Sequence, residues 1–85
     1  MIRESIVDFY GGFEEILFAD GFDDAIVGVC GLSYRVIYSK RKVILILMLE
    51  GMSDEDAIEH AEFNIFNSYV GEQTPIFMDD LEEML

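Results

Sequence analysis

The hydrophobic and polar positions in the middle of the chain predict a β-hairpin. Residues 25–30 form a short apolar run rich in β-branched side chains, and residues 34–38 alternate as a strand with one buried face does. Gly31-Leu32-Ser33 lies between them and is typical of a turn. Gly28, inside the first strand, indicates a bulge or the close approach of another backbone.

Two helices are predicted after the hairpin. Residues 43–49 are all apolar, and that run alone would suit a buried strand equally well. Ser39 can cap the amino end of a helix and Gly51 fits the left-handed position beyond its carboxyl end, so we expect a helix, although three bases in its first turn oppose the helix dipole. Ser53 followed by three acids starts a second helix, which we expect to reach about Val70.

The two ends of the chain carry shorter patterns. Apolar residues at three- and four-residue steps predict two short helical pieces near the amino end, interrupted at Gly11-Gly12. Pro75 restricts the apolar stretch 74–78 to an edge strand or a strand start. The sequence thus predicts an α+β fold: a β-hairpin, two helices and a returning strand, forming a three-stranded antiparallel sheet packed by helices, with an amino-terminal helical addition.

We expect a single domain over residues 1–85. Residues 1–21 would be the amino-terminal addition, residues 22–78 a ββααβ core and residues 79–85 an acidic tail. A chain of this length buries about 60–65% of its unfolded surface, so its stability without help is modest. Oligomerisation or the binding of a partner would increase this stability.

The number and distribution of charged residues exclude several classes of function. The chain has 18 acidic and 5 basic residues, a net charge of −13, and 52% hydrophobic residues. The apolar content excludes a disordered acidic tail, and the acid excess excludes a general electrostatic grip on nucleic acid. The charges are also segregated, because residues 25–49 hold four of the bases and no acid, whereas residues 50–85 hold eleven acids and no base.

The single cysteine and the short apolar runs indicate a cytoplasmic protein. Cys30 cannot form an intramolecular disulfide, and its apolar strand would raise its pKa and keep it inert. The run 43–49 is far shorter than the roughly 20 residues that span a bilayer, and no secretory signal opens the chain. We therefore expect no membrane partner.

Four segments within residues 22–78 carry a family resemblance: Phe22-Asp23-Asp24-Ala25-Ile26-Val27-Gly28, Gly51-Met52-Ser53, Glu62-Phe63-Asn64 and, most specifically, Tyr69-Val70-Gly71-Glu72-Gln73-Thr74-Pro75-Ile76-Phe77. In these segments the chain resembles a family of small proteins of unknown function found mainly in bacteriophage genomes. It implies a phage origin, hence the cytoplasm of an infected bacterium, and the order strand, strand, helix, helix, strand. It implies no activity. The first twenty residues and the absence of a Glu near Leu45 depart from the family pattern.

The sequence gives little indication of a catalytic site or a metal-binding site. His60 is the one histidine, Cys30 lies far from it in sequence, and no nucleophile elbow is present, so we expect no enzyme. Glu59, His60 and Glu62 point in different directions around a helix and would not easily converge on an ion. We expect no metal and no cofactor.

Glu59 and Glu62 fall inside the apolar arc of the second helix, where a buried carboxylate needs a partner. Arg35 or the bases at residues 40–42 would supply one, or the two carboxylates would simply rim the core. Alternatively, the acids form a surface presented to a basic partner protein. The residues of that surface would be Asp54, Glu55, Glu59 and Glu62.

The helix over residues 43–49 is apolar all round and must be buried all round. Either a second chain covers it, in a homodimer or higher oligomer with a self-association seam at Leu45, Met48 and Leu49, or the amino-terminal addition folds over it. Both alternatives stay open, as does a combination of the two.

These observations predict a non-enzymatic phage accessory protein that binds a host or phage protein through its acidic surface. One form is an inhibitor that imitates nucleic-acid charge and occupies the channel of a host defence or transcription enzyme, without binding nucleic acid directly. One alternative is a small-molecule or nucleotide-sequestering protein with a pocket near Tyr34, Tyr38 and Tyr69. Another is an oligomeric structural or assembly factor.

Overall fold

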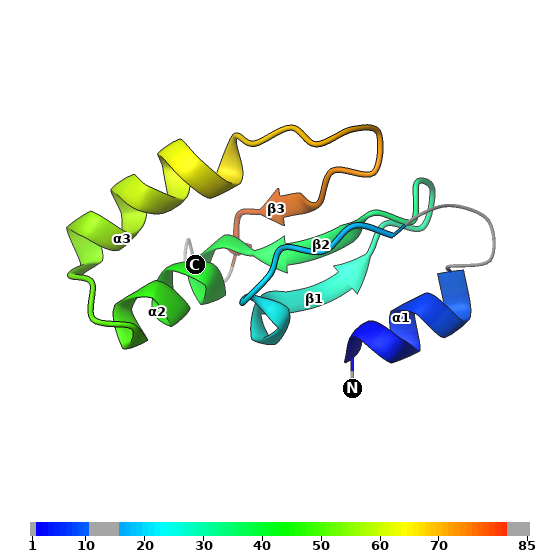
Figure 1. Ribbon diagram of the computed structural model, residues 1–85, viewed down its shortest axis with the longest axis horizontal. Helices are drawn as coiled ribbons and strands as arrows, with labels where there is room; N and C mark the ends of the chain where they lie inside the picture. Colours follow the sequence, from blue (N-terminus) through cyan, green and yellow to red (C-terminus); the bar gives the residue numbers. More distant parts are fainter. Residues whose placement is uncertain (1, 11–15, 82–85) are drawn as a thin grey trace.

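The computed structural model describes residues 2–10 and 16–81, with three α-helices and a three-stranded sheet in those residues (Figure 1). This confirms the α+β class. The elements are helix α1 (Ile2–Tyr10), the 3₁₀ turn η1 (Asp23–Ala25), strands β1 (Ile26–Val29) and β2 (Val36–Ser39), helices α2 (Lys40–Leu49) and α3 (Asp54–Ala61), the π-helical turn η2 (Glu62–Phe66) and strand β3 (Ile76–Met78).

The sheet has the order β1-β2-β3, so β2 is its central strand. β1 and β2 pair antiparallel, which confirms the predicted hairpin, with Ile26 opposite Tyr38 and Val29 opposite Val36. The register shifts between Ile26 and Gly28, so the bulge that Gly28 indicates is present.

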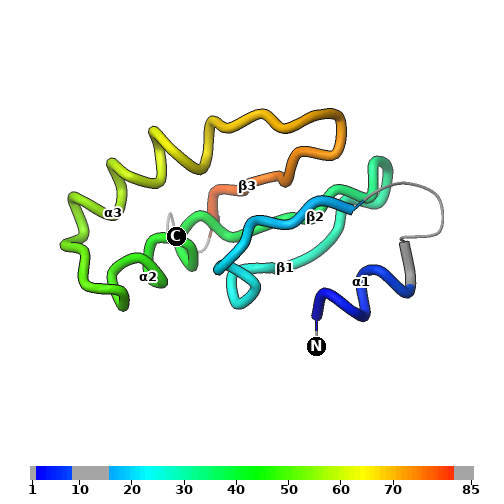
Figure 2. The backbone as a smooth tube through the Cα atoms, viewed as in Figure 1, coloured from blue at the N-terminus to red at the C-terminus, as the bar shows by residue number. Residues whose placement is uncertain are grey.

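The third strand corrects the prediction of an all-antiparallel sheet. β3 pairs with β2 in parallel, with Ile37 opposite Ile76 and Ser39 opposite Met78. α2 leaves the end of β2, α3 turns back, and residues 67–75 carry the chain along the sheet before it reverses into β3 (Figure 2). β3 therefore enters from the same end as β2.

α2 follows β2 without a break, and its predicted caps are both present. The Ser39 hydroxyl accepts a hydrogen bond from the Lys42 amide at 3.1 Å, and Gly51 has a φ of 111°. The same hydroxyl donates to Asp80 Oδ2 at 2.7 Å, while Asp80 Oδ1 accepts from the Arg41 amide at 3.4 Å. Asp80 thus brings a negative charge to the start of a helix whose first turn is basic.

α3 begins as predicted but ends earlier. The Ser53 hydroxyl accepts from the Asp56 amide at 3.2 Å. The α-helix changes at Ala61 into η2, which ends at Phe66 and does not continue to Val70. The Asn67 side chain donates to the Glu62 carbonyl at 2.7 Å and so satisfies one of the last carbonyls in place of a further turn.

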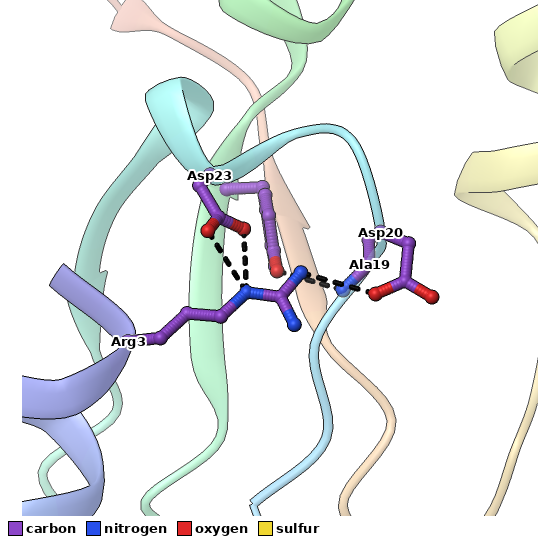
Figure 3. A network of polar contacts seen from close by, with 5 residues as sticks. Arg3, Ala19, Asp20 and Asp23 are labelled. Atoms are coloured by element: carbon purple, nitrogen blue, oxygen red, sulfur yellow. Dashed lines mark hydrogen bonds and ion pairs between the residues drawn. The ribbon is translucent and has the colours of Figure 1, made fainter. Parts of the chain in front are cut away.

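The first of the two predicted amino-terminal helices is α1. Of the second, residues 13–15 lie outside the described residues, and residues 16–19 are not helical. An ion pair attaches α1 to the rest of the chain: Arg3 Nε donates to both carboxylate oxygens of Asp23, at 2.7 and 2.9 Å, and Nη2 donates to Asp20 at 3.1 Å (Figure 3). Its guanidinium also lies 4.7 Å from the centre of the Phe18 ring.

The core gathers side chains from all three helices and from the hairpin. Its buried members are Ile6, Ala25, Ile26, Val36, Tyr38, Val43, Leu47, Ala57 and Ala61. Tyr38 is the largest fully buried side chain; its ring centre lies 5.4 Å from that of Phe77, and its hydroxyl accepts a hydrogen bond from the Ala19 amide at 2.7 Å. Burial raises the pKa of Tyr38 above its ordinary value.

Tyr38→Phe should destabilise the fold, because it leaves the Ala19 amide without its acceptor. We expect the free energy of unfolding to fall by about 1–3 kcal/mol, measured by urea titration. Tyr69→Phe is the matched control, because Tyr69 is largely exposed, and it should leave the free energy nearly unchanged. Equal effects of the two substitutions would contradict this role for Tyr38.

Candidate functional site

The binding residues predicted from the sequence all lie on α2, α3 and η2. The two helices pack through Val43 and Leu47 on α2 and Ala57 and Ala61 on α3, which are all buried. The small alanine side chains leave room for a close approach of the helices. Of the other large apolar side chains on these helices, Ile44 and Ile46 pack partly against the core, whereas Leu45, Met48, Leu49 and Ile58 are exposed.

The outward side of α2 is the predicted seam. Leu45, Met48 and Leu49 are exposed, and Leu49 retains 88% of its accessible surface. Of the two alternatives for what covers this helix, cover by α1 is excluded, because α1 lies at the opposite end of the molecule, at the lower right of Figure 1, and residues 11–15 of the amino-terminal addition lie outside the described residues. Within residues 2–10 and 16–81, the three side chains of the seam are thus exposed.

A groove runs between α2, α3 and the segment after β3. It has a volume of about 670 Å³ and brings the predicted seam residue Leu45 and the predicted partner residue Glu62 to one site. Its lining is Lys40, Arg41, Ile44, Leu45, Ile58, Glu62, Phe66, Asp79 and Asp80. We call this the α2–α3 groove.

The bases do not pair with the predicted acids. Lys40 Nζ lies 3.4 Å from Asp79 Oδ1 and 5.3 Å from the centre of the Phe66 ring, and Arg35 Nε donates to the Thr74 carbonyl. Within the described residues, neither Glu59 nor Glu62 forms an ion pair through its carboxylate, and both side chains are exposed. The alternative in which Arg35 or a base at residues 40–42 forms an ion pair with Glu59 or Glu62 is therefore wrong for the described residues.

The structure also divides the predicted acidic surface. Glu62 faces the α2–α3 groove, whereas Glu59 lies in a separate depression of about 380 Å³. The residues of that depression are Asp56, Glu59, His60, Phe63 and Asn64, and we call it the outer α3 face. Asp54 and Glu55 are exposed in the first turn of α3, where carboxylates favour the helix dipole.

Phe63 is the residue that sequence reasoning missed. Phe63 is not among the predicted site residues, yet 77% of its surface is exposed. Phe63 lies in η2, whose π-helical turn changes the angular spacing of side chains after Ala61. At constant helical spacing Phe63 already lies about 200° from Ala61, on the side opposite the buried alanines, so the spacing from Ala57 and Ala61 was a usable signal for its exposure.

Cys30 differs from the expected inert core thiol. It lies just beyond β1 at the base of the hairpin turn and is only half-buried. Hydrogen bonds from the Ser33 side chain, then from the Ser33 and Leu32 amides, lower the pKa of the thiol from its ordinary value of 9.0 to about 7, and Arg35 adds a smaller effect. The prediction of a raised pKa is wrong because it assumed an apolar strand.

The three tyrosines considered for a ligand pocket do not meet. Tyr38 is buried in the core, Tyr69 is exposed beyond η2, and Tyr34 lies beside the hairpin turn with a φ of 60°. The sequence-based hypothesis of a tyrosine-lined pocket therefore has no geometric basis.

Among residues 2–10 and 16–81, no group of three or more His, Cys, Asp or Glu side chains could hold a metal ion. In the same part of the chain, none of the helices has the length and apolar character needed to cross a membrane. Comparisons of the chain with protein-family models, with curated proteins and with solved structures give no match.

Cys30 should react as a thiolate near neutral pH. Because hydrogen bonds stabilise the ionised thiol, the rate of alkylation by iodoacetamide should reach half its maximum near pH 7. Ser33→Ala removes the largest contribution and should move that midpoint upward, toward the ordinary thiol value. A midpoint of 8.5 or higher in the unsubstituted protein, about that of a free cysteine, would contradict the assignment.

Proposed function

We propose that the protein is a non-enzymatic binding protein whose outer α3 face contacts a basic surface of a partner protein. The observation that carries this proposal is the exposed carboxylate of Glu59, which no described residue pairs with. Residues 50–85 contain no Lys or Arg, and the described contacts of Arg3, Arg35 and Lys40 lie elsewhere. The exposed carboxylate of Glu59 is therefore available to pair with a basic group of another molecule.

An aromatic anchor supports a protein partner. Phe63 stands exposed beside Glu59 in the same depression, with Asp56 and Asn64 around it. Interface hot spots commonly combine one large aromatic side chain with a polar rim. A carboxylate beside an aromatic ring suits lysine or arginine, because the cation can pair with the carboxylate and lie over the ring.

The resemblance to phage proteins suggests where such a partner would be found. It would be a host or phage protein in the cytoplasm of an infected bacterium. Enzymes that hold nucleic acid have basic channels, and these offer the charge that this face complements. An inhibitor that enters such a channel in place of nucleic acid is the most specific form of the proposal.

The test begins with capture from bacterial lysate on the immobilised protein, followed by purification of the retained partner. We expect Glu59→Lys and Phe63→Ala each to weaken binding of the purified partner at least about tenfold, because each removes part of the anchor. Glu72→Lys is the matched control, since it makes the same charge change on the exposed loop after η2 and should leave the affinity unchanged.

Binding should also weaken as salt rises, and the partner should bind nucleic acid and this protein in competition. A partner that binds the substituted proteins as tightly as the original would contradict the proposed surface. Failure of the original protein to retain anything beyond what Glu59→Lys retains would contradict it equally.

A further inference from the structure

The residues that precede η1 form an apolar hollow together with η2, the loop after η2 and β3. The hollow has a volume of about 210 Å³. Its wall comes from four segments that are far apart in the sequence, so it exists only in the folded chain. The apolar side chains of the wall are Phe18, Phe22, Ile65, Val70, Pro75 and Phe77. We call it the phenylalanine hollow.

Contacts with the core hold the wall of the phenylalanine hollow in place. The ring centre of Phe77 lies 5.4 Å from that of the buried Tyr38. The Val70 amide donates a hydrogen bond to the hydroxyl of the buried Thr74 at 2.9 Å. A ligand that enters this hollow therefore does not need to order its wall, which lowers the free-energy cost of binding.

The volume of the hollow limits the size of a ligand. Sites for drug-sized ligands measure about 300–1,000 Å³, whereas an apolar cavity of about 150 Å³ engineered into another protein holds one benzene ring. At about 210 Å³, the phenylalanine hollow suits a single ring with a short side chain and is too small for a nucleotide. The three phenylalanine side chains favour an aromatic ring, because pairs of aromatic rings attract each other beyond the burial of apolar area.

The charge at the rim selects the side chain of that ligand. Among the described residues that line the hollow, Asp20 is the one with a charged side chain. Arg3 is shared between two carboxylates, because its Nε donates to both oxygens of Asp23 and its Nη2 donates to Asp20 Oδ1 at 3.1 Å. One positive and two negative side chains leave one negative charge in excess.

The excess charge is accessible at Asp20. The Asp20 side chain is 95% exposed, and its other carboxylate oxygen points away from Arg3 (Figure 3). An ammonium group at the rim therefore gains a partner of opposite charge, whereas a carboxylate group meets a like charge.

We propose that the phenylalanine hollow binds a small aromatic amine, with the ring against the phenylalanine side chains and the ammonium group beside Asp20. The proposal does not rest on a partner protein. Asn64 lines both this hollow and the outer α3 face, but the other residues of the two sites differ.

Three probes with the same ring and different charges test the proposal in titrations of the full chain followed by two-dimensional NMR. Phenethylamine is a cation near neutral pH, phenethyl alcohol is neutral and hydrocinnamate is an anion. We expect phenethylamine to shift the amide signals of Ile65, Val70 and Phe77, with a Kd of about 1 mM. Phenethyl alcohol should bind about threefold more weakly, and hydrocinnamate should bind most weakly.

Substitutions separate the two parts of the site. Asp20→Asn should lower the affinity for phenethylamine to that for phenethyl alcohol and leave the affinity for the alcohol unchanged. Asp24→Asn is the matched control, because Asp24 is exposed and lies outside the lining. Val70→Trp should weaken binding of all three probes by filling the hollow, whereas the same change at the exposed neighbour Tyr69, which is not in the lining, should not.

A side chain of this chain itself is the alternative occupant. Phe13, outside the described residues, is the aromatic residue that most closely precedes Phe18 in the sequence. Binding of phenethylamine to Phe13→Ala but not to the unsubstituted protein would overturn the proposal. Absence of shifts up to about 10 mM probe, equal affinities for the three probes, or equal effects of Asp20→Asn and Asp24→Asn would also overturn it. Glu59→Lys should still bind phenethylamine, so failure of the partner-binding proposal would not affect this one.

Discussion

The chain has five basic side chains against eighteen acidic ones, and three of the five connect distant segments of the fold. Arg3 joins α1 to Asp20 and Asp23, Arg35 joins the hairpin to the Thr74 carbonyl, and Lys40 joins the start of α2 to Asp79. Each contact links segments far apart in the sequence. None of these three contacts involves α3, whose first-turn carboxylates are exposed.

The same distribution gives the helical pair two different outward faces. α3 presents carboxylates with the exposed aromatic ring of Phe63, and α2 presents apolar side chains between a basic start and an acidic end. The apolar contact between α2 and α3 is narrow, because on α3 it is made by the small side chains of Ala57 and Ala61. A chain of 85 residues has limited surface to bury, and contacts made by these faces would add to its stability.

Local signals in the sequence were sufficient for most of the fold. The caps at Ser39, Gly51 and Ser53 located both central helices, and Gly28 marked the bulge, because these features depend on neighbouring residues alone. The features that were predicted wrongly depend on contacts between residues far apart in the sequence. The parallel pairing of β3 depends on the path of residues 67–75, and the exposure of Phe63 follows from which face of α3 packs on α2, the face of Ala57 and Ala61.

The central claim is that the outer α3 face contacts a basic surface of a partner protein. Hydroxyl-radical footprinting of the purified protein, alone and with its purified partner, tests it most directly, because it reports the exposure of individual side chains. The account predicts that modification of Phe63 falls when the partner is added, while that of the exposed Tyr69 stays constant. Unchanged modification of Phe63, or equal protection of both residues, would contradict it.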